Sequence, residues 1–342
     1  MPESDILSTR KDKPLSPRNH DQKPIFHHIL ACLDASSASR ATLAHSVAIA
    51  SATGARLTVM RVLEPPAGQA STDPVDWQMC LRDAEVELRD RLLEFPDIDA
   101  KTVVIGGQVA ECICAWAHDN GVDLTVMAAT SDRNWSFGGL GGTARRVVEA
   151  TNSSVFLVPR SDPADAAIRY RRVMTPLDGS PRSECALPIA LAIASAHEAE
   201  VVLVHAAPNI DLTEIGPVEA EAIALRDQLR QRNKLVAEKY FKQVRSRLPP
   251  RQVATRTQVL AGGDPRHALA QAAMADRSDI IVLSSTGLSG HPDLSIGSVA
   301  EYLVSHADKP ILLVRANECM PPHTHRRTRD APAVRLPSRA LN

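Results

Sequence analysis

A glycine- and serine-rich segment near the end of the chain has the residue types that hold phosphate. LSSTGLSGHPDLSIGSVAEYLVSHADKPILLVR (283–315) contains an apolar strand, a loop with Gly287, Gly290 and Gly297-Ser298, an amphipathic run and a second apolar strand. Backbone N–H groups in such a turn, next to a helix N-terminus, form an anion cradle to which Ser298 adds a hydroxyl. The structural alternative is that the glycines supply positive φ and Ser298 caps the helix. Because no Lys follows, the loop is not a Walker A motif.

An acidic residue at the end of an apolar strand occurs twice. Asp34 lies in ILACLDASSAS and Asp178 in VMTPLDGSPRS. Either carboxylate could cap the following helix together with Ser36 or Ser180. Either could instead accept a hydrogen bond from a nucleotide base or ribose at the mouth of a sheet. Position alone leaves both alternatives open.

The chain is a tandem duplication. Residues 25–66 align with 170–209, which places Asp34 on Asp178. Further on, GGQVAECICAWA aligns with GGDPRHALAQAA, DLTVMAAT with DIIVLSST, and GGTARRVVEATNSSVFLVPR with IGSVAEYLVSHADKPILLVR. Matching segments in one order indicate two copies of one unit.

The duplication divides the chain into two domains with flanking segments. The first copy spans 25–160, a linker spans 161–169 and the second copy spans 170–315. Residues 1–24 are polar, and residues 316–342 are rich in Pro and Arg. Both flanking segments are expected to be disordered tails.

Each copy alternates apolar strands with helical stretches. The strands expected in the second copy are 173–178, 201–206, 253–260, 279–285 and 310–315. Continuous apolar strands indicate a parallel sheet that is buried on both faces. We therefore predict an α/β fold of two tandem, doubly wound, open parallel five-stranded sheets with helices on both faces. In the helix expected over 219–248, a stripe is predicted to pack on the sheet, formed by Leu225, Leu229, Val236, Tyr240 and Val244.

Composition narrows the classes of function. Of 342 residues, 44% are hydrophobic but only 3% aromatic, so the core must be aliphatic. A net charge of −1 gives no general attraction to nucleic acid or to anionic membranes. The N-terminus lacks an apolar signal region, and the longest apolar run, ALPIALAIASA, is too short to span a bilayer. The six cysteines have no CxxC spacing, so we expect reduced thiols in a cytoplasm and no metal site.

Together these segments resemble the universal stress protein family. That family's loop reads Gly, two residues, Gly, nine residues, then Gly-Ser/Thr, and Gly287, Gly297 and Ser298 fall on the last three places. LDGSPRS resembles the family's first strand and turn, and DKPILLVR the strand through which members pair. One departure is Ser284, which stands where the first Gly belongs. The resemblance covers both copies.

The resemblance implies ATP binding, with or without Mg²⁺, mainly in the second copy. It places Asp178 and Ala206 at the adenosine end of the ligand. It places Gly287, Gly297 and Ser298 at the ribose and phosphates, where the side chain of Ser284 could crowd the nucleotide.

The corresponding residues of the first copy are Asp34, Val62, Gly142 and Thr143. There, Ala128 and Ser131 replace the two earlier glycines, the loop is one residue longer, and it contains Trp135 and Phe137. A degenerate pocket with a structural or regulatory role is expected in this copy.

The expected function is that of a cytoplasmic, ATP-binding stress-response or regulatory protein whose nucleotide controls an unknown protein partner. No catalytic residue is assigned, so at most slow ATP hydrolysis is expected. The resemblance implies an intramolecular pseudo-dimer through SVFLVPR and PILLVR, and allows a homodimer.

Three other classes of function compete with this expectation. The main alternative is an interaction scaffold of the same fold that binds no nucleotide. An ATP-pyrophosphatase-type ligase is disfavoured because LDGSPRS and LDASSAS lack an SGGxDS-like loop. A phosphorelay receiver is excluded because it needs clustered acids and a Lys at neighbouring strand ends.

Overall fold

A computed structural model describes most of the two copies. The described residues are 25–65, 73–130, 139–160, 167–207, 220–248, 253–260, 263–288 and 295–315. The expected tails at 1–24 and 316–342, and most of the linker, lie outside these residues.

The described chain contains ten strands, five in each copy. The first copy has β1 (His28–Cys32), β2 (Arg56–Leu63), β3 (Ala100–Gly106), β4 (Leu124–Ala128) and β5 (Ser154–Val158). The second has β6 (Arg172–Pro176), β7 (Glu200–Ala206), β8 (Thr255–Leu260), β9 (Ile280–Ser284) and β10 (Ile311–Val314). The strands predicted for the second copy are all present, with ends that differ by one or two residues.

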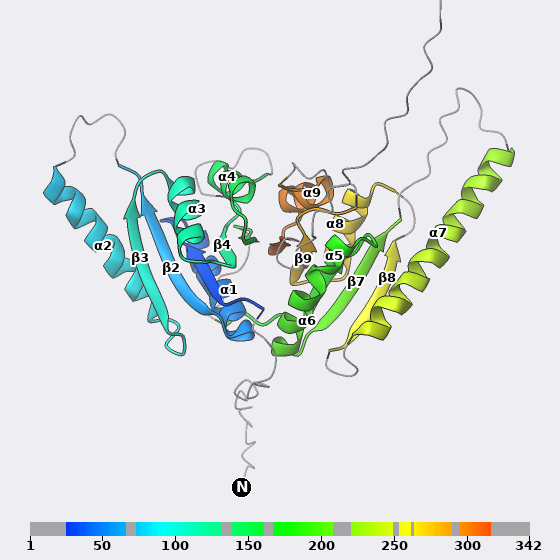
Figure 1. The fold of residues 1–342 in the computed structure, drawn as a ribbon, viewed down its shortest axis with the longest axis horizontal. Helices are drawn as coiled ribbons and strands as arrows, with labels where there is room; N and C mark the ends of the chain where they lie inside the picture. The colour runs from blue at the N-terminus through cyan, green and yellow to red at the C-terminus, as the bar shows by residue number, and fades with distance from the viewer. Residues whose placement is uncertain are drawn as a thin grey trace, which may run out of the picture.

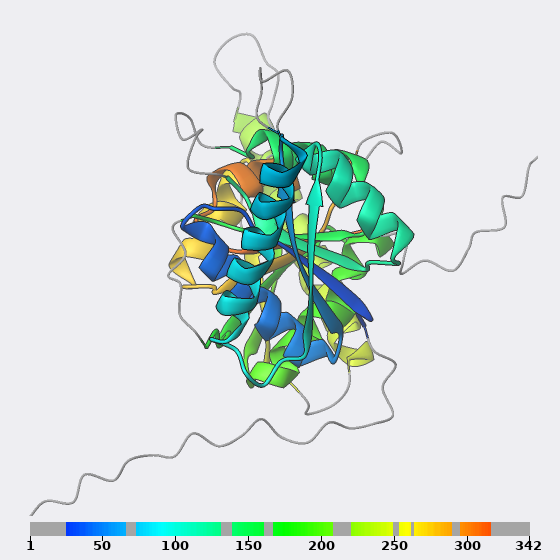
Figure 2. The same ribbon diagram turned by 90° about the vertical axis from the view of Figure 1, so that its left-hand side faces the viewer.

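Helices connect the strands. The first copy has α1 (Ala38–Thr53), α2 (Pro74–Leu92), α3 (Val109–Asp119) and α4 (Gly142–Ala150). The second has α5 (Pro181–Glu184), α6 (Ala186–His197), α7 (Ala220–Arg247), α8 (Pro265–Ala275) and α9 (Ser298–His306). One buried cluster joins residues of α1, α2, α6 and α7, and a second joins residues of α3, α4, α8 and α9. The sheet is therefore covered on both faces, and Figure 2 shows α2 lying over it.

Both copies have the same strand order, and they share one sheet. The order is β3-β2-β1-β4-β5-β10-β9-β6-β7-β8, which is a doubly wound five-stranded unit followed by its mirror order (Figure 1). All pairs within each copy are parallel, whereas β5 and β10 pair antiparallel. The predicted fold class is confirmed, and the antiparallel pair fuses the two five-stranded units into one ten-stranded sheet.

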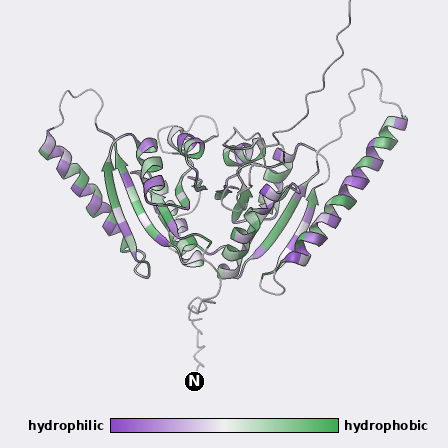
Figure 3. Cartoon of the chain, viewed as in Figure 1, coloured by the Kyte–Doolittle hydropathy of each residue, from purple (hydrophilic) through white to green (hydrophobic). Residues whose placement is uncertain are grey.

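The junction between the copies is buried on both faces of the sheet. Leu312 faces Phe156 across the antiparallel pair, and both side chains are fully buried. Beneath it, α1 of the first copy packs on α6 of the second. His45 and Tyr170 join the copies there through a hydrogen bond of 2.7 Å between the ring Nδ1 and the phenol oxygen. Figure 3 shows the mainly hydrophobic strands that form this core.

The stripe predicted for α7 is confirmed at its C-terminal end and wrong further towards the N-terminus. Val244 is buried and Tyr240 packs against the core, as predicted. The helix buries Ala237, Phe241 and Val244, whereas Leu225 and Val236 are 53% and 59% exposed. At 28 residues α7 is about 42 Å long, about twice the length of the seven-residue strand β7. Only its C-terminal part can therefore lie on the sheet, and Figure 1 shows the rest extending past β7 and β8. None of the helices in the described residues is long and apolar enough to cross a membrane.

Candidate functional site

The carboxyl ends of β6 and β9 meet where the strand order of the second copy reverses. This reversal is the place where open α/β sheets bind ligands. The two strands pair at only two positions, Val173 with Ile280 and Met174 with Ile281. In the first copy, β1 and β4 pair at four positions. Pro176 has no N–H to donate to a ladder, so the carboxyl ends of β6 and β9 are left unpaired with each other.

Asp178 lies just beyond β6 and contacts both sides of this opening. Its Oδ1 accepts hydrogen bonds from the N–H (2.9 Å) and the hydroxyl (2.6 Å) of Ser180. Its Oδ2 accepts one from the N–H of Leu288 (2.6 Å), which belongs to the loop after β9. Burial raises the pKa of Asp178, but the hydrogen bonds from Ser180 and Leu288 outweigh it, so the pKa lies below its ordinary value. Asp178 is therefore a carboxylate at neutral pH, with one oxygen in a structural turn and one facing the glycine loop.

Asp34 forms the same hydrogen bonds within its own turn as the Oδ1 atom of Asp178 does. Its Oδ1 accepts from the N–H of Ser36 (2.9 Å), from the Ser36 hydroxyl (2.5 Å) and from the Ser39 hydroxyl (2.9 Å). Both carboxylates thus hold the turn before a helix. Ser180 caps α5, as the sequence allowed, whereas the N-cap of α1 is Ser37 and makes no side-chain cap hydrogen bond. The contact from Asp178 to the glycine loop is an additional feature of the second copy among the described residues.

Gly287 allows the loop to approach Asp178 closely. A Cβ built on Gly287 would lie 2.3 Å from Asp178 Oδ2, so no other residue fits here without displacing the carboxylate. Gly297 lies at the other end of the loop, where its N–H donates to the carbonyl of Ser285 (2.7 Å). These two glycines lie at the two ends of the loop, next to the unpaired carboxyl ends of β6 and β9.

The helix after the loop begins without a side-chain cap hydrogen bond among the described residues. Gly297 is the N-cap of α9 and provides no side-chain cap, and Ser298 is the exposed first residue of the helix. The structural alternative that made Ser298 the N-cap is therefore wrong by one position. The first N–H groups of a helix have no partner within it and carry the positive end of its dipole. This end of α9 suits an anionic group.

Ser284 and Ala206 end the two strands that flank the site. Ser284 is the last residue of β9, is buried, and donates its hydroxyl to the carbonyl of Thr286 (2.7 Å). The side chain that stands in place of a glycine is thus satisfied within the loop. Ala206 is the last residue of β7 and is partly buried against the adjoining core.

The first copy keeps part of this arrangement. Gly142 starts α4 and Thr143 follows it, and this helix also lacks a side-chain cap. The N–H of Gly141 donates to the carbonyl of Ala129 (2.8 Å), as Gly297 does to Ser285. Val62 lies near the end of β2 and is partly buried. The loop residues Ser131, Trp135 and Phe137 lie outside the described residues.

Arg315 supports the site and was not predicted from the sequence. It is 9% exposed, and burial lowers its pKa. Its guanidinium donates to the carbonyls of Ser295, just before α9, and of Val148, near the end of α4 in the other copy. Arg315 thus ties the glycine loop to the first copy. The sequence contains no signal for this role, because the matching position of the first copy is Pro159.

The described residues contain no group of three or more His, Cys, Asp or Glu that could hold a metal ion. The donors at the carboxyl edge are a single carboxylate, backbone N–H groups and hydroxyls. Such a set suits a polar organic anion that has hydroxyl groups, and it would hold a cation only through that ligand.

Comparison with known proteins gives one family. The family model described as "Universal stress protein family" matches residues 25–159 and again 169–315. A universal stress protein of Thermus aquaticus is 32% identical over 146 residues, which cover 43% of this chain and 99% of that protein. One from Methanocaldococcus jannaschii is 28% identical over 149 residues, covering 43% of this chain and 82% of that protein.

Solved structures match over most of the chain. The functionally unknown protein PA1789 of Pseudomonas aeruginosa has a TM-score of 0.61 at 13% identity, covering 86% of this chain and 94% of that one. A universal stress protein from Archaeoglobus fulgidus has a TM-score of 0.55 at 17% identity, covering 84% and 96%. At these identities the likeness concerns the fold alone. The two family matches and the duplicated fold together make this chain a tandem, two-domain member of the universal stress protein family.

Proposed function

We propose that the second copy binds an adenine nucleotide at its carboxyl edge and that this chain is an ATP-binding regulatory protein of the stress response. The observation that carries the proposal is the early end of the β6–β9 ladder. It leaves an opening at the switch point, with a carboxylate on one side and a glycine loop on the other. Nucleotides bind to doubly wound sheets at such openings.

The residues on the two sides suit the two ends of a nucleotide. Asp178 Oδ2 can exchange the N–H of Leu288 for a ribose hydroxyl or an adenine amino group, because both are donors. The uncapped start of α9 at Ser298 suits the phosphates. Mg²⁺, where present, would be held mainly by those phosphates. We assign no catalytic residue, so the nucleotide serves as a switch for binding a protein partner.

Ser284 is compatible with this proposal. Its hydroxyl is directed to the Thr286 carbonyl, so it stabilises the start of the loop and adds no unsatisfied polar atom to the opening. We place the protein in the cytoplasm, where the thiols of Cys32, Cys80, Cys112 and Cys114 would remain reduced.

The test is ATP titration by calorimetry on the full chain and on Gly297→Val. Gly297 has φ −83°, and its built Cβ comes no closer than 3.5 Å to the loop backbone, so the variant should fold. Its branched side chain would occupy the space in front of the α9 N-terminus. We expect ATP affinity to fall by roughly tenfold or more, as for the loss of a charge-assisted contact. Gly141→Val, at the N-cap of α4, which matches Gly297 in its hydrogen bonds, should leave ATP affinity unchanged.

The second candidate is a scaffold that binds no nucleotide. It is favoured by one observation: Asp178 already has hydrogen-bond partners on both oxygens. Mass spectrometry of the denatured, freshly purified protein separates the two functions. ATP or ADP near one per chain supports the nucleotide site. No released nucleotide and no heat of ATP binding would refute it and leave the scaffold.

A further inference from the structure

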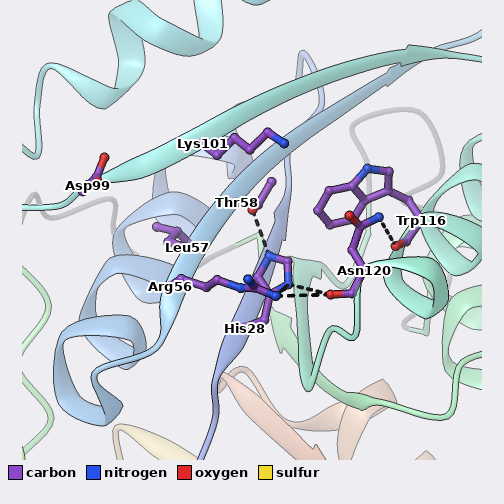
Figure 4. A pocket seen from close by; sticks show the side chains of 8 residues that line it. All are labelled: His28, Arg56, Leu57, Thr58, Asp99, Lys101, Trp116 and Asn120. Carbon is purple, nitrogen blue, oxygen red and sulfur yellow. Dashed lines mark hydrogen bonds between the residues drawn. The ribbon is translucent and has the colours of Figure 1, made fainter.

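The amino edge of the sheet in the first copy contains a cavity of about 270 Å³, at the opposite end of the strands from the proposed nucleotide site (Figure 4). His28 starts β1, Arg56 starts β2, and Lys101 lies near the start of β3. Trp116 and Asn120, from the end of α3, form another wall. The cavity thus has two cations, an imidazole and an indole around one space.

The two cations of the cavity, Arg56 and Lys101, have no ion-pair partner among the described residues, although Asp99 also lines the cavity. Arg56 instead lies with its Nη2 3.1 Å from Nδ1 of His28 and 3.4 Å from the carbonyl of Asn120. Burial lowers the pKa of His28, and Arg56 and Lys101 lower it further, whereas the Asn120 carbonyl and the Asp123 carboxylate oppose the shift. The histidine is therefore neutral at pH 7, and the two long cations keep their charge.

The duplication supplies an internal control for this cavity. Strand register places His28, Arg56 and Lys101 of the first copy at the positions of Arg172, Glu200 and Arg256 of the second. The turns after α3 and α8 place Asn120 at Asp276, and Trp116 at Ala272. Every wall of the cavity therefore has a matched position in the same molecule.

In the second copy these positions neutralise one another. Glu200 pairs with Arg172 (3.3 Å) and with Arg256 (3.5 Å), and Asp276 pairs with Arg256 (3.2 Å). Two cations there face two carboxylates. In the first copy, Arg56 stands at the position of Glu200 and reverses its charge. Asn120 stands at the position of Asp276 and is neutral. Arg56 and Lys101 therefore have no ion-pair partner in the described chain and are available to an anion from outside it.

We propose that this cavity binds a small planar organic anion, an aryl carboxylate or an aryl phosphate. Arg56 and Lys101 supply the charge for the anionic group. The indole of Trp116 faces the cavity, with its ring centroid 5.7 Å from that of His28 in an edge arrangement, and offers an apolar surface to a flat ring. The volume suits a ligand of one ring with one anionic substituent.

The imidazole of His28 holds the wall of the site in place. Its Nε2 is 2.9 Å from the hydroxyl of Thr58, and its Nδ1 is 3.1 Å from the Asn120 carbonyl. Thr58 is 3% exposed and His28 is 4% exposed, so both are fixed inside the sheet. The site is therefore built on strand residues and does not depend on the glycine loop or on the proposed nucleotide site.

The experiment uses the full chain and benzoate as the probe, followed by calorimetry and by the indole N–H resonance of Trp116, assigned by its loss in Trp116→Phe. Acetate provides the charge without the ring, and benzyl alcohol the ring without the charge. We expect benzoate to bind and to shift the Trp116 resonance, and both comparison compounds to bind at least about tenfold more weakly. Phenyl phosphate in place of benzoate distinguishes the two kinds of anionic group.

The variants follow from the internal control. Arg56→Glu combined with Asn120→Asp places acids at the positions of Glu200 and Asp276, and should abolish benzoate binding while the chain stays folded. Arg256→Gln, the matched change in the second copy, should leave benzoate affinity unchanged, as should Gly297→Val in the nucleotide site. An unshifted Trp116 resonance, or equal benzoate affinity in the wild type and the double variant, would overturn the proposal.

Discussion

Gly287→Ala should destabilise the fold through one identifiable contact. The built Cβ lies 2.3 Å from Oδ2 and 3.4 Å from Cγ of Asp178, well inside the distance of normal contact. Alanine can be accommodated only if the Asp178 carboxylate and the loop separate. The hydrogen bond of 2.6 Å from the N–H of Leu288 is then lost. The hydrogen bonds from Ser180 use the other oxygen and can remain.

The size of the effect follows from that hydrogen bond. A hydrogen bond to a charged group contributes about 1.5–3 kcal/mol to the free energy of unfolding, and the lower end applies because Asp178 is exposed. Alanine also reduces the conformational freedom of the unfolded chain, which offsets roughly 0.5 kcal/mol. We therefore expect Gly287→Ala to lower the free energy of unfolding by about 1 kcal/mol.

Urea unfolding of the full chain, followed by far-ultraviolet circular dichroism, measures this loss. Gly142→Ala is the matched control, because a Cβ built on Gly142 meets nothing within 4 Å. It should be neutral or stabilising by up to about 1 kcal/mol, since Gly142 lies in the first turn of a helix. Faster amide exchange at Leu288 in Gly287→Ala would identify the broken contact. An unfolding midpoint equal to that of the wild type would refute the reasoning.

Two further predictions concern groups that hold the site together. The folded-state pKa of Asp178 is below its unfolded value of about 3.9. The carboxylate therefore stabilises the fold above that pH, and this contribution is lost as the pH falls through the folded-state pKa. The difference in urea midpoint between wild type and Asp178→Asn should therefore be present at pH 7 and shrink below about pH 4; an equal difference at both pH values would contradict this. Arg315→Met leaves the buried carbonyl of Val148 and the partly buried carbonyl of Ser295 without their donor and should cost roughly 2 kcal/mol of unfolding free energy. Arg145→Met removes only an exposed ion pair with Glu301 and should cost less than about 0.5 kcal/mol, so similar losses in the two variants would argue against a special role for Arg315.

The fold could be predicted because it depends on patterns that are local and repeated. Continuous apolar strands determine a parallel sheet with two covered faces, and the aligned copies fix the order of the elements twice. The packed face of α7 was not predictable in the same way. Two apolar stripes compete on that helix, and the position of the sheet decides that Phe241 is buried and Val236 exposed.

The candidate site was predicted in its residue types but not in its contacts. Asp178 and Gly287 were singled out from separate motifs, 109 positions apart by their numbers, and the structure brings their atoms together. The consequence of Pro176 could not be foreseen, because a missing N–H matters only once the neighbouring strand is known. The role of Arg315 likewise depends on the antiparallel junction, which places a carbonyl of the first copy beside it.

The two copies have diverged at opposite ends of their strands. The second copy has opened its carboxyl edge, where the β6–β9 ladder ends early, and has neutralised its amino edge with the pairs of Glu200 and Asp276. The first copy keeps a longer β1–β4 ladder and leaves Arg56 without a carboxylate partner among the described residues at its amino edge. A duplicated unit whose copies served only to support each other would have no physical reason to expose different charges at different edges. The two edges belong to one continuous sheet whose buried core includes Phe156 and Leu312. This arrangement favours two distinct sites in one body over one working copy and one inert copy.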